Sequence, residues 1–296
     1  MVSMGLTRIK VFSEMIKFEH TVFALPFAYL GVFLAVGGFP SLAQFIWITL
    51  AMVGARTAAM SLNRLIDRHI DARNPRTEVR ALPKGLIPVY QVWIYTILSF
   101  LLLYIAASQL NPLCVKLMPI AVLFLVAYSY MKRITWLCHV VLGISIGLAP
   151  VGAWVAITGT LNLTNDLAAI LLGTAVTFWV AGFDVIYACQ DYEFDRKEGL
   201  HSIPARFGLV GALRIARLFH AMVPVFLFLV AVVLKLGFFY LAGVVVATVI
   251  LFYEHSLVRA DDLSRLDTAF FNMNGILSVV MFLFTLAEII YPTSLF

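Results

Sequence analysis

Nine stretches of mostly apolar residues follow one another along this chain of 296 residues. A helix of about 20 such residues crosses the hydrocarbon core of a membrane, and a helix pairs its backbone polar groups within its own segment. The candidate spans are residues 21–38, 43–63, 89–109, 112–130, 138–158, 166–189, 209–232, 236–254 and 271–291. Hydrophobic residues make up 62% of the chain and charged residues 12%, whereas a soluble domain is roughly half apolar and a quarter charged. The sequence therefore predicts an all-α polytopic membrane protein with nine transmembrane helices, folded as one integral-membrane domain over residues 1–296.

Lysines and arginines are concentrated at the N-terminus and in every second connection between the spans. They are Arg8, Lys10 and Lys17 before the first span; Arg64, Arg68, Arg73, Arg76, Arg80 and Lys84 after the second; Lys132 and Arg133 after the fourth; Arg196, Lys197 and Arg206 after the sixth; and Arg259 and Arg265 after the eighth. The opposite connections carry only Lys235. Because basic residues favour the cytoplasmic side, we expect an integral protein of the cytoplasmic (inner) membrane, with its N-terminus and these loops in the cytoplasm and its C-terminus outside. This placement of basic residues accounts for the net charge of +5, so we expect no nucleic acid partner.

The second candidate span runs directly into a polar stretch, NRLIDRHID, residues 63–71. Asn63, Asp67 and Asp71 stand four residues apart, a spacing that stacks them on one face of a helix. A row of charge beside lipid is costly and indicates a functional site. A single row of this kind is also common at the solvated end of an ordinary helix.

A second row with the same spacing ends the sixth candidate span, in the stretch YACQDYEFD. Tyr187, Asp191 and Asp195 repeat the interval, and Asp184 lies seven residues before Asp191, on the same face and two turns deeper. Basic residues follow both rows: Arg76, Arg80 and Lys84 after the first, and Arg196, Lys197 and Arg206 after the second. Two matching rows on one side of the membrane favour a built site over two unrelated helix ends.

Facing rows of carboxylates supply the hard oxygen ligands that Mg²⁺ prefers, usually together with substrate phosphates. Arginine and lysine side chains would bind the remaining phosphate oxygens. The implied substrate is a diphosphate whose other end dissolves in lipid, which describes a polyprenyl diphosphate. Mg²⁺ and the cations would stabilise charge on the departing diphosphate, and a nucleophile would capture the allylic carbocation.

At these residues the chain resembles the UbiA-type intramembrane aromatic prenyltransferases, which include 4-hydroxybenzoate polyprenyltransferases. The first motif, NRLIDRHIDARNPRTEVRALPKG (63–85), is similar to the family's N-x-x-x-D-x-x-x-D followed by R-T-x-x-R-x-L-P-x-G. The second, YACQDYEFDRKEGLHSIPARFG (187–208), is similar to Y-x-x-x-D-x-x-x-D with a downstream S-x-x-x-R-F-G. A third element, Y-x-x-x-K, is matched by YSYMK, Tyr128 to Lys132.

The resemblance implies nine helices around a central cavity that is open laterally to lipid and capped on the cytoplasmic side. It also implies Mg²⁺-dependent transfer of a prenyl chain to an acceptor. Three roles carry over by motif position. Asn63, Asp67, Asp71, Asp191 and Asp195 would hold Mg²⁺ and diphosphate, the four aspartates being the catalytic residues; Arg76, Arg80 and Lys132 would contact phosphate; and Tyr128 and Tyr187 would orient these groups or steady the cation by their ring faces.

The N-terminal segment IKFEHTVFALPFA (16–28) departs from the hydroxybenzoate enzymes, which typically have an R-x-D-K-P-like sequence there. Its Lys17, Glu19 and His20 resemble the branch associated with menaquinone made by the futalosine route, whose acceptor is a dihydroxynaphthoate. The expected acceptor is thus an aromatic acid, either 4-hydroxybenzoate or a dihydroxynaphthoate, in ubiquinone or menaquinone biosynthesis. Haem, chlorophyll or a lipid is the alternative acceptor within the family.

Arg56 lies seven residues before Asn63, on the same face and about 10 Å deeper at the helical rise per residue. A buried arginine in a span should face a cavity or a partner. One interpretation is that Arg56 binds the carboxylate of the acceptor. The other, slightly favoured, is an ion pair between Arg56 and Asp184 across the cavity, and the two can coexist.

Two other functional classes are disfavoured by the motifs. The CDP-alcohol phosphotransferases also place aspartates at a membrane interface, but their D-G pair is missing before Asp67. A cation transporter would favour carboxylates near the middle of the bilayer, and basic neighbours would repel its substrate. Among the remaining polar residues, we expect Glu254 to be solvated and His139 to lie at the membrane interface.

Overall fold

The computed structural model describes residues 10–17 and 21–293, with side chains described in the first range and from residue 25 onward in the second. The described chain consists of helices and their connections. The long helices are α2 (Thr21–Val36), α3 (Leu42–Asp71), α4 (Val89–Leu110), α5 (Pro112–Met131), α6 (Cys138–Thr158), α7 (Leu167–Ala188), α9 (Ile203–Leu234), α10 (Phe238–Leu257) and α11 (Asn274–Ile290). The short elements are a helix over residues 10–15, the 3₁₀ turn η2 (Cys189–Asp191), α8 (Tyr192–Lys197) and the π-helical turn η3 (Thr268–Met273).

Eight helical stretches among the described residues are long and apolar enough to cross a membrane, and α2 adds a shorter apolar helix from Leu25 to Val36. Each of the nine predicted spans therefore corresponds to a helix, which confirms the all-α membrane fold. The main boundary differences concern two helices. The helix α3 continues to Asp71, and α9 begins at Ile203, with a break at Gly208, whose φ of 70° and ψ of 170° are not helical.

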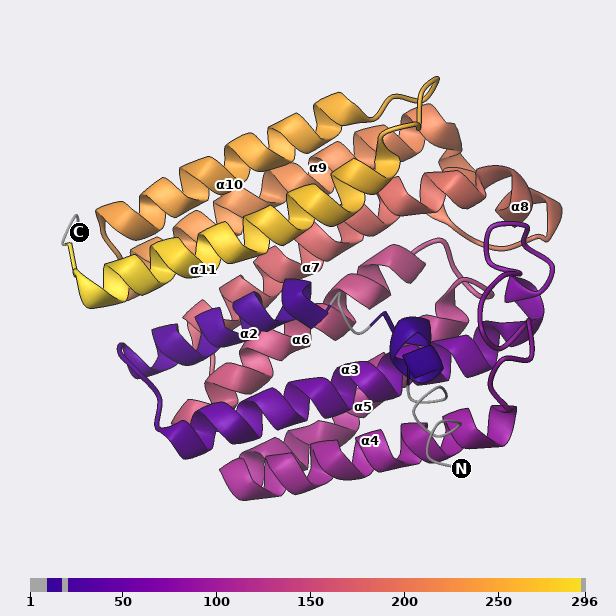
Figure 1. The fold of residues 1–296 in the computed structure, drawn as a ribbon. Coiled ribbons are helices and arrows are strands. Elements are labelled where there is room, and N and C mark those ends of the chain that lie inside the picture. The colour runs from indigo at the N-terminus through magenta and orange to yellow at the C-terminus, as the bar shows by residue number, and fades with distance from the viewer. Residues whose placement is uncertain (1–9, 18–20, 294–296) are drawn as a thin grey trace.

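The long helices lie roughly parallel or antiparallel to one another, so that every second connection is at the same end of the bundle (Figure 1). We call this the site end. It comprises the connections over residues 72–88, 132–137, 189–202 and 258–267. These connections carry ten of the 21 lysines and arginines, whereas the described connections at the opposite end carry only Lys235, the asymmetry that the charge pattern predicts.

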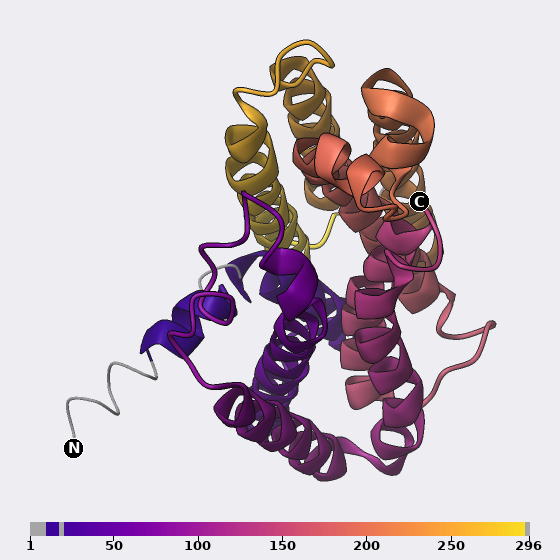
Figure 2. The ribbon, with the colours of Figure 1, turned by 90° about the vertical axis from the view of Figure 1, so that its right-hand side faces the viewer.

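Successive helices pack side by side, and α2 closes the arrangement by contacting α11, α6 and α3. Figure 2, a view onto the site end, shows α3 and α4 on one side of the bundle and α9 to α11 on the other. Helices α6 and α7 approach each other closely through small residues. A Cβ at Gly147 of α6 would come within 2.5 Å of the Gly173 carbonyl oxygen of α7, so glycine is required where these two helices meet.

A buried polar network joins α7, α10 and α11. Trp179 Nε1 donates a hydrogen bond of 2.6 Å to Asn274 Oδ1. Asn274 Nδ2 faces three acceptors, Glu254 Oε1 at 3.3 Å and the carbonyl oxygens of Ala269 and Phe270 at 3.3 and 2.9 Å. These carbonyls belong to the π-helical turn η3, where the regular helical bonding is interrupted. The prediction that Glu254 is solvated is therefore wrong, because the side chain is fully buried against Asn274.

Glu288 has a different role at the opposite end of the bundle. Its carboxylate accepts hydrogen bonds from the backbone N–H groups of Gly237 (2.9 Å), Phe239 (3.0 Å) and Thr293 (2.9 Å). The first two N–H groups stand at the start of α10, where a helix leaves donors without an internal partner. A negative charge here is also favoured by the helix dipole.

We expect Asn274→Leu to lower the free energy of unfolding by about 2–3 kcal/mol, because it leaves the buried Trp179 N–H without its acceptor and removes the side-chain donor from two π-turn carbonyls. Denaturant unfolding in detergent micelles, followed by tryptophan fluorescence, would measure the change. Asn272→Leu is the matched control, since Asn272 is exposed on the same turn. Equal destabilisation by both substitutions would contradict the role given to Asn274.

Candidate active site

The first acidic row occupies the last turns of the 30-residue helix α3. Asn63 Nδ2 donates to Asp67 Oδ2 at 3.0 Å and to Ser129 Oγ of α5 at 3.4 Å. Asp71, the last residue of α3, is buried. The three residues share one side of the helix, as their spacing predicts.

The second row lies on a helical path that tightens as it leaves the membrane. Asp184 and Tyr187 belong to α7, Asp191 ends the 3₁₀ turn η2, and Asp195 lies on α8. The sequence predicts one regular helical face, whereas the structure interrupts the α-helix between Tyr187 and Asp195. The two aspartates still point to a common partner, because Lys132 Nζ lies 2.8 Å from Asp195 Oδ1 and 4.0 Å from Asp191 Oδ2.

Each of the four motif aspartates is paired with a cation. The pairs are Asp67 with Arg133 at 2.8 Å, Asp71 with Arg80 at 2.6 Å, Asp191 with Arg76 at 2.6 Å and Asp195 with Lys132 at 2.8 Å. All four acids have at most about a quarter of the side chain exposed. Pairing of this kind offsets the cost of removing a carboxylate from water.

Arg76 connects the loop that follows the first row to the second row. Its Nε and Nη2 donate to the two carboxylate oxygens of Asp191 at 2.9 and 2.6 Å, and its Nη1 donates to the Tyr187 hydroxyl at 3.1 Å. The guanidinium carbon also lies 5.1 Å from the centre of the Tyr187 ring, within cation–π range. Asn74 Nδ2 adds a third hydrogen bond to Asp191 at 2.9 Å.

The surroundings of Arg76 and Lys132 favour the charged form of both side chains. Burial lowers the pKa of Arg76, but the hydrogen bonds and ion pair with Asp191 outweigh it and raise that pKa above its ordinary value. Burial likewise lowers the pKa of Lys132, while Asp195 and Asp191 raise it by more. Both side chains therefore remain positively charged and able to bind an anion.

Three contacts at this site come from residues to which the sequence motifs assign no role. Arg133 follows Lys132 directly and pairs with Asp67, and Asn74 lies in the loop after the first row. Arg73 pairs with Glu198 at 2.9 Å and ties the two motif loops together. The only signal for them was proximity to the motifs, since their partners are distant in sequence.

The two tyrosines differ in position. Tyr187 faces Arg76 as described, and the Tyr128 hydroxyl donates to the backbone carbonyl of Ala59 on α3 at 3.1 Å. Tyr128 therefore fastens α5 to α3, and it presents its ring to the cavity described below. This position is deeper than that of the four ion pairs.

The suggested ion pair between Arg56 and Asp184 is not formed. Asp184 Oδ2 instead lies 2.7 Å from His139 Nδ1. The backbone N–H of Ile203 donates to His139 Nε2 at 3.2 Å, so the ring proton belongs on Nδ1 and is donated to Asp184. His139 is thus a buried structural partner and not an interfacial residue. Arg56 Nη2 lies 3.5 Å from the Lys17 carbonyl oxygen. Glu19 and His20, which resemble the menaquinone branch in sequence, lie outside the described residues.

An apolar cavity of about 330 Å³ lies between α3, α4, α5 and α6. Its lining includes Met52, Leu103, Leu117 and Ile146, with Arg56 and Tyr128 among the few polar groups. Residues 59 and 60 of α3 also line it, and Asn63 follows within one turn. The cavity therefore begins about one helical turn, or about 5 Å, below the first acidic row.

The residues present suit Mg²⁺ by their donor chemistry. No three His, Cys, Asp or Glu side chains in the described ranges surround one point as a closed metal cage would. Mg²⁺ does not require such a cage, because one or two carboxylates usually hold it together with waters and substrate phosphates. Asp71 Oδ2 is buried and has no hydrogen-bond partner among the described residues, so one hard oxygen ligand is available in the first row.

Comparison with known proteins identifies the family of the chain. Residues 24–276 match the UbiA prenyltransferase family. The 4-hydroxybenzoate octaprenyltransferase of Vibrio cholerae is 29% identical over 246 residues, covering 81% of this chain and 83% of that protein. The apo structure of a UbiA homolog from Aeropyrum pernix K1 has a TM-score of 0.83 at 31% identity, covering 91% of this chain and 98% of that one. A UbiA homolog from Archaeoglobus fulgidus bound to GPP and Mg²⁺ shares the fold, with a TM-score of 0.71 at 23% identity over 94% and 99% of the two chains.

A double-mutant cycle with Arg76→Ala and Asp191→Ala tests the ion pair between these two side chains. We expect a coupling of about 1.5–3 kcal/mol in the free energy of unfolding, because charged hydrogen bonds shielded from water are strong. Side chains of Arg259 and Asp261 are 73% and 72% exposed, so the same cycle there should give no coupling above error. Equal coupling in both cycles would contradict the special strength of the Arg76–Asp191 pair.

Proposed function

Because the chain belongs to the UbiA prenyltransferase family, we propose that it transfers a polyprenyl group from a polyprenyl diphosphate to an aromatic acid, with Mg²⁺ as cofactor. The main observation behind this proposal is that two rows of aspartates, each paired with cations, lie at the same end of the bundle next to an apolar cavity. Polar and apolar halves of the site match the two ends of such a substrate. A cation transporter would not need either the basic partners or the adjoining apolar cavity.

The diphosphate would lie between the two rows. Arg76, Arg80 and Lys132 are close enough to the aspartates to bind both an acid and a phosphate oxygen, and Arg133 joins them on the evidence of its pair with Asp67. Asn63, Asp67 and Asp71 in the first row and Asp191 and Asp195 in the second would hold Mg²⁺. When bound, Mg²⁺ supplies Lewis-acid stabilisation of the charge that develops on the leaving diphosphate.

The prenyl chain would occupy the apolar cavity between α3 and α6. Arg56 and Tyr128 stand at the polar part of its lining, and most of the rest is apolar. Burial of an isoprenoid chain there gains about 25 cal/mol for each Å² removed from water. The A. fulgidus homolog bound to GPP and Mg²⁺ supports this class of donor substrate for the fold.

In the proposed reaction the bond between C1 of the prenyl chain and the diphosphate oxygen breaks, and the diphosphate leaves with the electron pair. A ring carbon of the acceptor forms the new bond to C1, and the ring then loses the proton from that carbon. The Tyr187 ring lies 5.1 Å from the Arg76 guanidinium carbon, and in this proposal its face would also stabilise positive charge on the allylic carbon. Asp67, Asp71, Asp191 and Asp195 are the residues on which the release of diphosphate would depend.

We assign Arg56 to the carboxylate of the acceptor. Arg56 lines the cavity together with Tyr128. Asp184 is bound instead to His139, and this contact holds α7 against α6. The V. cholerae relative is a 4-hydroxybenzoate octaprenyltransferase, which favours an aromatic acid such as 4-hydroxybenzoate, with a dihydroxynaphthoate as the second candidate. The product would be a quinone precursor, made in the cytoplasmic membrane with the site end facing the cytoplasm.

Removal of Mg²⁺ or of one aspartate should abolish transfer. We expect Asp67→Asn and Asp191→Asn each to reduce the transfer rate by about a hundredfold or more, the usual effect of losing an electrostatic contact to developing charge. The assay would use purified protein, labelled prenyl diphosphate, 4-hydroxybenzoate or dihydroxynaphthoate, and EDTA followed by Mg²⁺. Asp261→Asn, outside both rows, is the control.

The outcomes separate the parts of the proposal. Diphosphate binding without transfer to either aromatic acid would retain the metal site but overturn the acceptor class. Absence of any Mg²⁺-dependent diphosphate binding would overturn the assignment of the two rows.

Arg56→Gln should raise the KM for the aromatic acid about ten- to a hundredfold, the range expected for a lost charge-assisted hydrogen bond. The KM for the prenyl diphosphate should change little, because Arg56 lies two turns below the first row. Arg68→Gln on the same helix is the control, since its Nη1 bonds only the local Leu65 carbonyl at 2.9 Å in the described structure. An equal rise in both KM values would show that Arg56 does not select the acceptor.

A further inference from the structure

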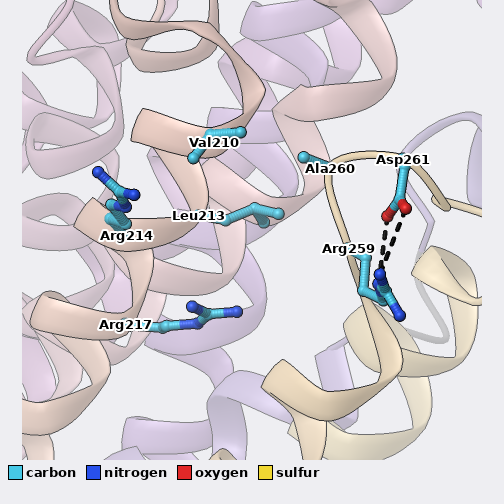
Figure 3. Close-up of a pocket in the computed structure, with 7 residues that line it drawn as sticks. All are labelled: Val210, Leu213, Arg214, Arg217, Arg259, Ala260 and Asp261. Atoms are coloured by element: carbon cyan, nitrogen blue, oxygen red, sulfur yellow. Dashed lines mark hydrogen bonds and ion pairs between the residues drawn. The ribbon is translucent and has the colours of Figure 1, made fainter.

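A second cluster of cations lies at the site end, away from the aspartate rows. A pocket of about 260 Å³ is lined by Val210, Leu213, Arg214, Arg217, Arg259, Ala260 and Asp261. We call it the basic pocket. Two of its arginines come from α9, three residues apart, and the third comes from the connection between α10 and η3 (Figure 3). Figure 3 shows Arg217 extending across the pocket toward the Arg259 segment.

The basic pocket has an excess of positive charge. Asp261 is its only acid, and its carboxylate accepts hydrogen bonds from Arg259 at 3.2 and 3.3 Å. Arg214 and Arg217 have no ion pair with any residue in the described ranges. Three arginines against one aspartate leave two positive charges without an ion-pair partner among the described residues.

The pocket also lies where the apolar surface of the bundle ends. Leu218 on α9 and Phe252 on α10 are 62% and 81% exposed, as side chains that face lipid would be. Tyr253, half exposed one turn before the end of α10, is of the type that favours the headgroup level of a membrane. A ligand in the pocket would therefore have one side against the lipid-facing surface and the other against the arginines.

We propose that the basic pocket binds the phosphate group of an anionic membrane lipid. Guanidinium groups match phosphate oxygens in charge and geometry, and basic pockets between membrane helices at the cytoplasmic side bind anionic headgroups. Val210 and Leu213 give the floor of the pocket an apolar character that suits the glycerol and the start of the acyl chains. A soluble phosphate would use the same arginines but gain nothing from the adjoining apolar surface.

Native mass spectrometry of the full chain in detergent tests this, with phosphatidylglycerol or phosphatidylcholine added at the same concentration. We expect the first phosphatidylglycerol to bind more tightly than phosphatidylcholine. The preference should fall about fivefold for each arginine removed, the effect of one basic residue near an anionic surface. The variants are Arg259→Gln and the double change Arg214→Gln with Arg217→Gln. Arg265→Gln, on the same connection but outside the pocket, is the matched control.

Four results would overturn the proposal, the fourth being displacement of the lipid by inorganic phosphate. The preference for phosphatidylglycerol could persist in the double variant, or it could fall equally in Arg265→Gln. Alternatively, a prenyl diphosphate that occupies the aspartate site could displace the bound lipid. A competition with inorganic phosphate separates the two sources of the anion: displacement of the lipid by millimolar phosphate would assign the pocket to a soluble anion. Arg259→Gln gives an independent reading if the double variant does not fold, and none of these measurements depends on prenyl transfer.

Discussion

Four aspartates stand at the end of an apolar bundle, and much of the site end is organised by the need to neutralise them. A carboxylate taken out of water costs several kcal/mol unless a cation and hydrogen bonds compensate. The cations reach Asp67, Asp191 and Asp195 from segments more than 60 residues away in the chain. Each pair therefore also fixes a loop onto a helix end. Arg76 has the widest effect, because it holds the loop after α3 against the end of α7 by three hydrogen bonds.

Under the proposed function, the same pairing would allow a metal and a diphosphate to bind together. Mg²⁺ would take over as the partner of the aspartates, while the diphosphate would take over as the partner of the arginines and Lys132. Neither the acids nor the bases would be left uncompensated at any stage, since each gains a new opposite charge as it loses the old one. Metal alone or diphosphate alone would leave one set unpaired, and favourable coupling between the two ligands follows from this.

The sequence predicted the helices and both acidic rows because these depend on local periodicity. Apolar stretches of membrane length and a four-residue polar interval can be read without knowledge of the fold. It failed where a side chain has its partner on another element. Asp184 was paired with Arg56 by depth alone, whereas His139, one helix earlier, is the nearer base. Glu254 was assigned to solvent because it follows an apolar span, and only the packing of α11 reveals its contact with Asn274.

Arg133 and Asn74 were missed for a related reason. They lie in irregular connections, where spacing does not determine the direction of a side chain. Their contacts with Asp67 and Asp191 arise because α5 and α3 bring the two connections to the same end of the bundle. Conversely, Lys132 was found because the Y-x-x-x-K element resembles a family motif, and the structure places it between the two acids of the second row.

The two rows look equivalent in sequence, but they are supported differently. The first lies on one continuous helix, so its geometry follows from α3 itself. The second crosses a 3₁₀ turn, and its Tyr187 ring packs 4.2 Å from Phe270 on the π-helical turn. Asn274 bonds the carbonyl oxygens of that turn, so α11 helps to position a tyrosine on α7. The C-terminal helices carry none of the motifs, yet the shape of the second row depends on them. Substitutions around Asn274 should therefore disturb Tyr187 and Arg76 more than the first row, because the geometry of that row follows from the continuous helix α3.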